Sequence, residues 1–491
     1  MPSITACNPS EVAALRQKRG FCSQCLTILL LANHAIHSFD GAIRRCRSLL
    51  NIPMVNLKTF KFCTVFIIIG GFLIYLFWTG FGPVKKIIGY NVPPQKLPPA
   101  VDFLEAPPGF NVSIFAKGLS GPRVIAFDSN GRMLVSEPEG GKVLVLEDKD
   151  QDGVADGQKV ILDGLRLPHG LDFYTDSQTK IVYLYVAETH QVSRFIYDSA
   201  KGEVPNPFGH NIANLPADGR HFTRTIGFGP NYRTQAIIPG YRETETLADQ
   251  KLYISVGSSC DTCVETETWK RAAILESNPA GTYTAEFAGG LRNSVFFAFH
   301  PKTGEMWATE MGRDNLGDEL PPDEINIVKV ADEGDKFGAR RYGWPFCYGN
   351  RVTDKTFKPG KIDRIDIPTD CSQTEPSFID IPAHSAPLGL AFIDSDKWPK
   401  EWRGDLLVAF HGSWNRSQPR GYKVVRFDLD ENGNPPAGGA QPKNQDGADF
   451  ITGFYDGRNT LGRPVDLKFG PDQALYISDD SAGVIYRVVP I

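Results

Sequence analysis

The residues with the clearest capacity for chemistry surround one group of short strand-like runs. Arg292 and Asn293 precede an aromatic run at 295–299, and a turn connects it to a second run that ends at Glu310. A glycine-containing acidic loop, 312–324, separates the second run from a third. Strand, turn, strand, loop and strand are typical of one antiparallel sheet. A cation, an amide and several carboxylates at one edge of a sheet indicate a site for an anionic ligand that is coordinated to a cation.

Further cations and one histidine recur at comparable places along the chain. Arg123, His169 and Arg224 each lie four residues before a phenylalanine, and Asn293 and Arg463 lie six residues before one. Guanidinium groups pair with carboxylates and phosphates, and a histidine can act as a general base near neutral pH. A single arginine or histidine is more often a salt-bridged or core side chain. The shared spacing favours a common site instead.

A repeated unit must position these side chains. From residue 109 onward, short apolar runs alternate with turns and show no helical period. Six units align on a phenylalanine that ends a first strand, and each is followed by a second strand. The six residues are Phe127, Phe173, Phe228, Phe299, Phe392 and Phe469. Six in-phase repeats predict an all-β, six-bladed β-propeller over residues 106–491 and argue against a flat β-sandwich.

Charge divides the chain in two. Residues 1–90 carry ten Lys and Arg against two acidic residues, a net charge of +8. The remainder carries 42 basic and 55 acidic residues, a net charge of −13, within a total of −5. The net negative charge of the residues after 90 would repel nucleic acid, which excludes binding driven by overall charge.

An apolar segment precedes the repeats. Residues 61–82 carry no charge after the first residue and are long enough to cross a bilayer as one helix. More basic residues precede this segment than follow it, which places a tail, 1–60, in the cytosol and the propeller outside the cell or in the secretory lumen. A proline-rich stretch, 83–105, predicts a semi-rigid linker. The alternatives are a cleaved signal peptide and a translation start at Met54.

Cysteines and sequons fit the same secretory route. Of nine cysteines, four lie beyond the apolar segment: Cys260, Cys263, Cys347 and Cys371. An even number in this setting favours two local disulfides. A metal site or a redox motif is the alternative for the C-x-x-C pair at 260–263. The sequons that predict N-glycosylation are Asn111 and Asn415.

Several motifs, in this order, resemble the quinoprotein glucose/sorbosone dehydrogenases, which include fungal pyranose dehydrogenases that use pyrroloquinoline quinone (PQQ). The motifs are L-P-H-G-L-D (167–172), G-L-R-N-S-V-F-F-A-F-H-P (290–301), T-E-M-G-R-D-N-L-G-D-E-L-P-P-D-E-I-N (309–326), Y-G-W-P-F-C-Y-G (342–349), A-F-H-G-S-W-N-R-S (409–417) and G-R-P-V-D-L-K-F-G-P-D-Q-A-L-Y-I-S-D-D (462–480). The resemblance covers residues 106–491.

The resemblance implies a function and roles for these residues. The cofactor is a tricyclic ortho-quinone with three carboxylates, and Ca²⁺ holds its quinone oxygens. His169 takes the proton from a sugar hydroxyl while a hydride passes to the quinone, and Arg292 and Asn293 contact the quinone. The other residues expected to hold the cofactor and substrate are Arg123, Arg224, His411 and Arg463. The expected Ca²⁺ ligands are Glu310, Gly312, Arg313, Asp314 and Glu324, and the residues expected to flank the sugar are Trp344 and Trp414.

The chain departs from the family pattern in two places. Val295 stands where bacterial members have glutamine, and a cofactor-contacting lysine of some members has no equivalent. Neither a haem domain nor a carbohydrate-binding module is expected. Electrons from an aldose, pyranose or sorbosone-like aldehyde therefore pass to an external quinone, cytochrome or copper protein.

Two other functions compete with the dehydrogenase. A Ca²⁺-dependent propeller hydrolase or lactonase needs metal ligands from several blades, whereas the inner positions here are mostly arginine. A non-catalytic cell-surface propeller has no use for a base such as His169. Separately, residues 148–153 begin like an EF-hand loop, but Lys159 occupies the position of the bidentate glutamate, which favours an acidic hairpin tip.

Overall fold

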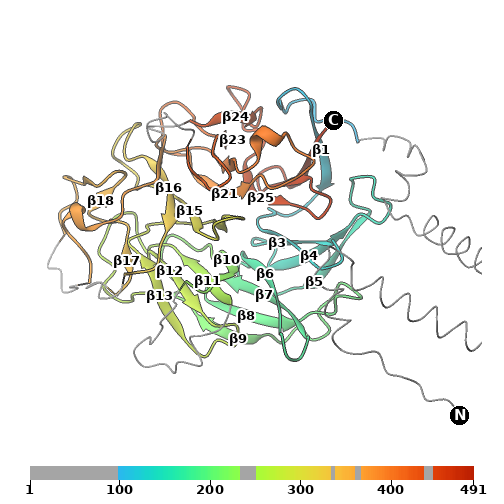
Figure 1. Cartoon of the computed structure of the whole chain (residues 1–491), viewed down its shortest axis with the longest axis horizontal. Coiled ribbons are helices and arrows are strands. Elements are labelled where there is room, and N and C mark those ends of the chain that lie inside the picture. Colours follow the sequence, from blue (N-terminus) through green and yellow to red (C-terminus); the bar gives the residue numbers. More distant parts are fainter. Residues whose placement is uncertain (1–97, 233–249, 333–337, 360–365, 436–445) are drawn as a thin grey trace, which may run out of the picture. The chain divides into compact units, whose positions relative to one another are not determined.

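In the part of the chain that the structure describes, mostly antiparallel strands form six sheets of four or five strands, arranged as the blades of a propeller, and one further sheet of two strands (Figure 1). The structure is a computed structural model, and it describes residues 98–232, 250–332, 338–359, 366–435 and 446–491. The first strands of neighbouring blades contact one another all the way round the ring. The predicted all-β, six-bladed fold is confirmed.

The first three blades follow the predicted units. Blade 1 contains β2 (Ile125–Phe127), β3 (Met133–Glu137), β4 (Lys142–Glu147) and β5 (Gly157–Leu162). Blade 2 contains β6 (Leu171–Thr175), β7 (Val182–Glu188), β8 (Gln191–Ile196) and β9 (His210–Asn214). Blade 3 contains β10 (Ile226–Pro230), β11 (Gln250–Val256), β12 (Ala273–Ser277) and β13 (Thr284–Gly289), with β17 (Arg340–Arg341) added in parallel to β13.

The last three blades complete the ring. Blade 4 contains β14 (Phe297–Phe299), β15 (Met306–Glu310), β16 (Asp323–Val328) and β20 (Ile379–Ile381). Blade 5 contains β21 (Pro387–Phe392), β22 (Leu406–Phe410), β23 (Lys423–Phe427) and β24 (Ala448–Ile451). Blade 6 contains β25 (Pro464–Phe469), β26 (Leu475–Asp479), β27 (Val484–Pro490) and β1 (Phe110–Lys117).

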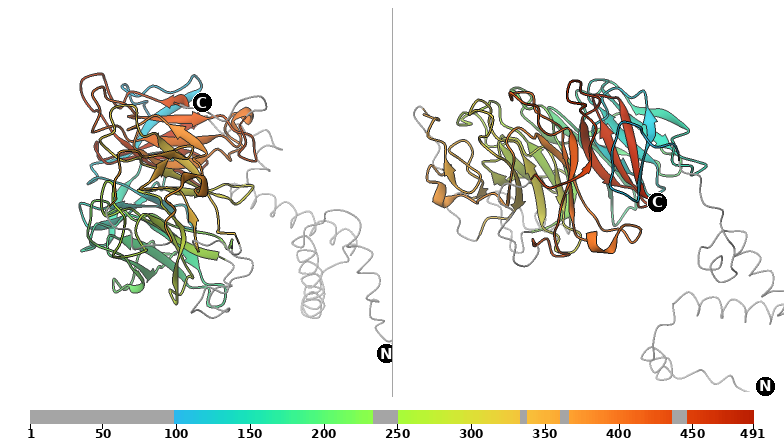
Figure 2. Two further views of the ribbon diagram at one scale, coloured as in Figure 1. Left: turned by 90° about the vertical axis from the view of Figure 1, so that its left-hand side faces the viewer. Right: turned by 90° about the horizontal axis from the view of Figure 1, so that it is seen from above.

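Blade 6 is built from both ends of the propeller sequence. β1 comes first in the chain, yet it pairs antiparallel with β27, the last strand, from Phe110 with Pro490 to Lys117 with Val484. In the right-hand view of Figure 2, β1 lies beside the red strands of this blade. The pairing closes the ring, because the outer strand of the sixth blade is supplied by the segment that leads into the first.

The core lies between neighbouring blades. Trp307 of β15 is fully buried, and its ring packs edge-on against Phe378, at 4.8 Å between centroids, and Phe392 of β21, at 5.3 Å. Burying one large apolar side chain contributes about 1.5–3 kcal/mol, so such contacts hold each blade against the next. Buried aspartates add to this: Asp172 of β6 accepts the backbone N–H of Phe228 in β10, at 2.7 Å.

The longest insertion lies in blade 4, between β16 and β20. It contains β17 and a small hairpin of β18 (Cys347–Tyr348) and β19 (Val352–Thr353), followed by the 3-10 helix η1 (Cys371–Gln373). Cys347 and Cys371 form a disulfide that joins the hairpin to η1, as predicted. The other 3-10 helix of the described chain, η2 (Lys400–Trp402), lies in the turn of blade 5.

The segment before β1 differs in part from the expected linker. Within 83–105, Ala100 forms a bridge with Ser113 of β1, and Glu105 forms one with Thr452 beyond β24, so the described end of this stretch belongs to the propeller. The predicted membrane segment, 61–82, and the tail before it lie outside the described residues. Within the described ranges, no helix is both long and apolar enough to cross a membrane.

Candidate active site

The direction of antiparallel strands brings the functional side chains to one edge of the propeller. The start of a first strand and the end of the second strand lie at the same edge of a blade. In blade 4, Phe297 at the start of β14 pairs with Ala308, two residues before the end of β15. The segments that precede the first strands and the loops that follow the second strands therefore meet around one end of the ring, which we call the site edge.

A cavity of about 260 Å³ opens at the site edge. Blades 3, 4 and 5 supply its walls. The lining residues are Arg220, His221, Arg292, Asn293, Met311, Gly312, Asp314, Asp323, His384, Ala386, Ser413 and Trp414. The predicted residues that this cavity brings together are Arg292, Asn293, Gly312, Asp314 and Trp414. The cavity is thus lined by two arginines, Arg220 and Arg292, and by two aspartates, Asp314 and Asp323.

Arg292 is held firmly although it lines the cavity. It is 4 % exposed, and its Nη1 donates to the carbonyl oxygen of Met311 at 3.2 Å. Its Nη2 lies 2.8 Å from a carboxylate oxygen of Asp261 and 3.5 Å from one of Asp314. Because all three guanidinium nitrogens have protein partners, the group is fixed in orientation at the cavity wall.

Two aspartates form the acidic wall of the cavity. The carboxylate of Asp323 accepts the N–H of Gly312 at 2.8 Å and that of Ala386 at 2.9 Å. Burial raises the pKa of Asp323 to about 6, and burial also raises the pKa of Asp314. A bound cation would offset the cost of holding two charged carboxylates there, and Ca²⁺ prefers oxygen ligands of this kind.

Three basic residues of the cavity were not predicted. Arg220 Nη2 lies 3.7 Å from Asp314 Oδ2, and His384 Nε2 lies 2.9 Å from the carbonyl oxygen of Gly317. Burial, together with the charge of Arg292, lowers the pKa of His221 to about 3, so this imidazole is neutral. For Arg220 and His221, the sequence signal that could have identified them is that two basic residues stand directly before the third repeat.

His169 lies in a buried cluster next to the axis. Its side chain is 1 % exposed and is not among the residues that line the cavity, but the ring of Phe296, three residues beyond Asn293, packs against it at 5.5 Å between centroids. Nδ1 lies 3.4 Å from Thr225 Oγ1, whereas the buried Nε2 has no hydrogen-bond partner among the described residues. Burial, and then the charge of Arg123, hold the pKa of His169 well below 6.5, so the imidazole is neutral.

The residue after His169 explains how it is placed. A Cβ atom at Gly170 would lie 2.6 Å from the carbonyl oxygen of Arg224 and 2.6 Å from the nitrogen of Ile226. Only glycine permits this approach of blade 2 to blade 3. The Gly170 N–H donates to the Arg224 carbonyl at 2.8 Å, which fixes the backbone of the L-P-H-G-L-D motif.

An aspartate that was not predicted connects two predicted residues beside His169. Asp480, which follows β26, accepts from Arg123 Nη1 at 2.6 Å and lies 3.0 Å from His411 Nε2. Burial alone would raise the pKa of Asp480, but these two partners hold it well below its usual range. Burial lowers the pKa of His411 to about 4. Arg123 and His411 are therefore brought together, and their partner is a carboxylate of the protein itself.

Two of the arginines expected to hold the cofactor donate to backbone carbonyls instead of lining the cavity. Arg224 is fully buried, and its guanidinium donates to the carbonyl oxygens of His221, Thr223 and Pro216. Burial lowers the pKa of Arg224 to about 9. Arg463 donates to the carbonyl oxygens of two residues, His411 and Gly412. Neither lines the cavity, and both hold loops of the site edge in place.

Two of the expected metal ligands, Glu310 and Glu324, are placed away from the cavity. Glu310 accepts from the N–H of Asn293 and the hydroxyl of Ser294, and burial raises its pKa to about 8. Glu324 accepts from the Gly349 N–H and from Asn326, and burial raises its pKa to about 7. Neither carboxylate lines the cavity.

Of the expected ligand Arg313 and the two expected tryptophans, one residue lines the cavity and two do not. Arg313 turns to Asp354, at 2.8 Å, and does not line the cavity. Trp414 lines its mouth and is 70 % exposed. Trp344 instead donates from Nε1 to the carbonyl oxygen of Asp261 at 3.2 Å and lines a separate small cavity.

Other predicted features are placed as follows. Cys260 and Cys263 form a disulfide, as expected, so their sulfurs are not free to bind a metal. Within 148–156, three carboxylates gather between β4 and β5, and Lys159 pairs with Glu203 instead of joining them. The sequon residues Asn111, in β1, and Asn415, beside Trp414, are both half-buried.

Comparison with known proteins adds an independent observation. Residues 104–490 match the family described as TrAA12-like. The chain is 28% identical over 389 residues to an uncharacterized protein of Borreliella burgdorferi, covering 78% of this chain and 90% of that protein. It is 24% identical over 424 residues to the pyrroloquinoline quinone-dependent pyranose dehydrogenase of Coprinopsis cinerea, covering 77% of this chain and 54% of that protein. The chain therefore spans about half the length of the Coprinopsis relative.

Solved structures share the fold. The calcium structure of a Trichoderma reesei carbohydrate-active enzyme of family AA12 superposes with a TM-score of 0.63 at 21% identity, covering 79% of this chain and 97% of that one. The holo form of the PQQ domain of the Coprinopsis cinerea pyranose dehydrogenase gives a TM-score of 0.62 at 22% identity, covering 80% and 98%.

Proposed function

The chain belongs to the TrAA12-like family, and we propose on this basis that it is a dehydrogenase that oxidises a sugar with PQQ bound in the cavity at the site edge. The observation that carries the proposal is the pairing, in one cavity, of two guanidinium groups with two carboxylates. Relatives named as PQQ-dependent sugar dehydrogenases support the class of cofactor and substrate.

The residues present fit this cofactor. Arg220, Arg292 and Asn293 offer donors to the carboxylates and quinone oxygens of PQQ. Asp314 and Asp323 offer carboxylate oxygens to a Ca²⁺ ion, whose charge would offset the burial that raises the pKa of each. When bound, the ortho-quinone supplies an acceptor for a hydride from the substrate carbon.

His169 is the base in this proposal. Its neutral imidazole has a buried Nε2 without a partner in the described chain, and that lone pair can accept the proton of a sugar hydroxyl that reaches past Asn293 in the cavity wall and past Phe296. Thr225, at Nδ1, and the ring of Phe296 hold the plane of the imidazole. The positive charge that forms on protonation is balanced in part by the nearby carboxylate of Asp480.

The proposal is tested with the full chain, PQQ, Ca²⁺ and a panel of aldoses, pyranoses and sorbosone-like aldehydes, with reduction of a dye as the readout. We expect dye reduction that requires PQQ and that falls when a chelator removes Ca²⁺. Binding of PQQ without oxidation of any sugar would overturn the sugar assignment. Failure to bind PQQ would overturn the whole proposal and favour the hydrolase or the non-catalytic propeller.

The setting of the enzyme is part of the same proposal. Residues 61–82 anchor the chain in a membrane, with the propeller outside the cytosol, and the electrons pass to an external quinone, cytochrome or copper protein. The support is the uncharged apolar segment and the two disulfides, which are typical of secreted domains.

The pH dependence of turnover should follow His169. The base acts in its neutral form, so activity falls as the pH drops through the pKa of His169, which lies well below 6.5. We therefore expect the acid limb of kcat/KM to lie well below pH 6.5. Replacing Arg123 by glutamine removes a charge that lowers this pKa and should move the limb to higher pH. An acid limb at or above pH 6.5 in the unmodified enzyme would contradict the assignment.

Trp414 should contribute to sugar binding and not to chemistry. It is exposed at the cavity mouth, where an aromatic face can pack on a sugar ring. Trp414→Ala is expected to raise KM by about 2- to 10-fold with little change in kcat. Phe208→Ala, at an exposed aromatic in blade 2 that does not line the cavity, is the control and should change neither constant.

A further inference from the structure

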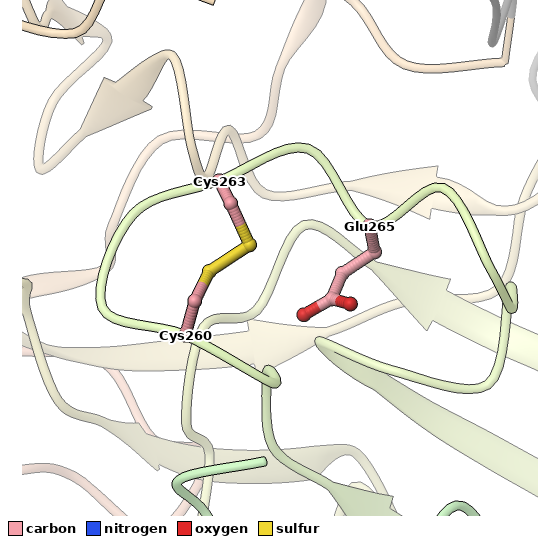
Figure 3. Close-up of side chains that lie close together, drawn as sticks. All are labelled: Cys260, Cys263 and Glu265. Carbon is pink, nitrogen blue, oxygen red and sulfur yellow. A yellow bond between two sulfur atoms is a disulfide. The ribbon is translucent and has the colours of Figure 1, made fainter. Parts of the chain in front are cut away.

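A four-residue loop closed by a disulfide lies directly behind the cavity. Cys260 and Cys263 follow β11 and are joined by their sulfurs, as Figure 3 shows. The carboxylate of Glu265 lies beside this loop in the same view and accepts the N–H of Ser259 at 2.5 Å and its hydroxyl at 3.0 Å. The disulfide therefore joins the two ends of the loop, and Glu265 holds the residue directly before it.

Asp261, inside this loop, is the point on which several site residues converge. One of its carboxylate oxygens accepts from Arg292 Nη2 and from the backbone N–H of Asp314, both at 2.8 Å. Its carbonyl oxygen accepts from Arg292 Nε at 3.0 Å and from Trp344 Nε1 at 3.2 Å. Through its side chain and its backbone, Asp261 thus fixes the guanidinium of Arg292, the backbone of Asp314 and the indole of Trp344.

These contacts set the plane of the Arg292 guanidinium. Nε and Nη2 donate on the same side, to the carbonyl and the carboxylate of Asp261, so the group cannot rotate without losing both bonds. The position of Asp261 in turn depends on its loop. An unconstrained loop samples many backbone conformations, and the disulfide removes much of that freedom.

We propose that Asp261 is the positioning residue of the cofactor cavity and that the Cys260–Cys263 disulfide holds it in place. This inference rests on the proposed function. Asp261 acts through Arg292 and Asp314 and does not line the cavity itself. Opening the disulfide would loosen one wall of the cavity, so the ability to bind PQQ would depend on the oxidation of these two cysteines.

The test compares PQQ binding by the full chain and its variants, with equilibrium dialysis and the absorption spectrum of bound PQQ as readouts. Asp261→Ala is expected to weaken PQQ binding by about 10- to 100-fold, because hydrogen bonds to charged groups are lost. Asp261→Asn keeps an acceptor oxygen and should bind with an intermediate affinity. The control is Asp472→Ala, which breaks another arginine–aspartate pair, with Arg487 at 2.8 Å, away from the cavity.

The disulfide is tested in parallel by serine variants, because a chemical reductant would also reduce the quinone. Cys260→Ser with Cys263→Ser should weaken PQQ binding and shift the spectrum of the bound cofactor. Cys347→Ser with Cys371→Ser, at the other disulfide, should leave both unchanged. If Asp261→Ala does not fold, the serine variants still test whether the Cys260–Cys263 loop affects PQQ binding.

The outcomes separate the two proposals. If the unmodified chain does not bind PQQ, the proposed function fails and this inference fails with it. If the unmodified chain binds PQQ and the variants at 260, 261 and 263 bind it equally well with the same spectrum, only the positioning role is overturned. The inference is supported if the Asp261 and Cys260/Cys263 variants bind PQQ more weakly while the Asp472 and Cys347/Cys371 variants bind it as the unmodified chain does.

Discussion

Replacing His169 by alanine is expected to lower kcat by about 10²- to 10⁴-fold, the contribution typical of a general base. The affinity for PQQ should change little, because His169 does not line the cavity that would hold the cofactor. The physical reason is the state of Nε2, which is buried, neutral and without a partner in the described chain. Steady-state kinetics together with PQQ titration distinguish loss of the base from loss of the cofactor.

His300 provides a matched control. It is likewise 1 % exposed with a buried, unpartnered Nε2 within the described residues, and burial lowers its pKa too. It lies after β14, in the turn at the opposite edge of blade 4 from the site edge. His300→Ala should therefore keep its turnover after any loss of stability is allowed for. A His169→Ala protein that oxidises sugars as fast as the unmodified enzyme would remove the base assignment.

Replacing Arg292 by alanine should have the largest effect on cofactor binding. The substitution removes a donor to PQQ and leaves Asp261 and Asp314 as partly buried carboxylates without their main partner. Truncating one member of a buried charged pair costs about 2–5 kcal/mol, so PQQ binding should weaken by at least about 30-fold. Calorimetric titration of the full chain with PQQ measures this directly.

Arg487→Ala is the control for that experiment. Arg487 pairs with Asp472 in blade 6 and does not line the cavity. It should lose some stability but keep its affinity for PQQ. If Arg292→Ala and Arg487→Ala bind PQQ equally well, the cofactor does not contact Arg292, and the cavity assigned to it is wrong.

Much of the fold could be predicted from the sequence because each blade repeats one local pattern. All six aligned phenylalanines lie in the first strand of a blade, and the run after each forms the second strand. The cavity includes expected residues where they follow that pattern directly, as Arg292 and Asn293 do before β14. The family resemblance is confirmed by the match over residues 104–490.

Some expected site residues lie away from the cavity, for physical reasons that a repeat cannot reveal. Successive side chains of a strand point to opposite faces. Asp323 and Glu324 are adjacent in β16, yet only Asp323 lines the cavity, and sequence alone does not say which of the two faces it. Arg224 keeps the repeat spacing but turns to backbone carbonyls. Asp261, in a loop outside the repeat pattern, has no equivalent in other blades from which to predict it.

The pairing of β1 with β27 has a consequence for how the protein is made. β1 emerges from the ribosome before every other strand of the propeller, and its partner emerges last. Until β27 has been made, β1 remains an unpaired strand edge, the kind of surface that attracts wrong partners. A stop codon within β27 would therefore leave β1, at the opposite end of the propeller sequence, without its partner. The ring should therefore be completed only after β27 has left the ribosome.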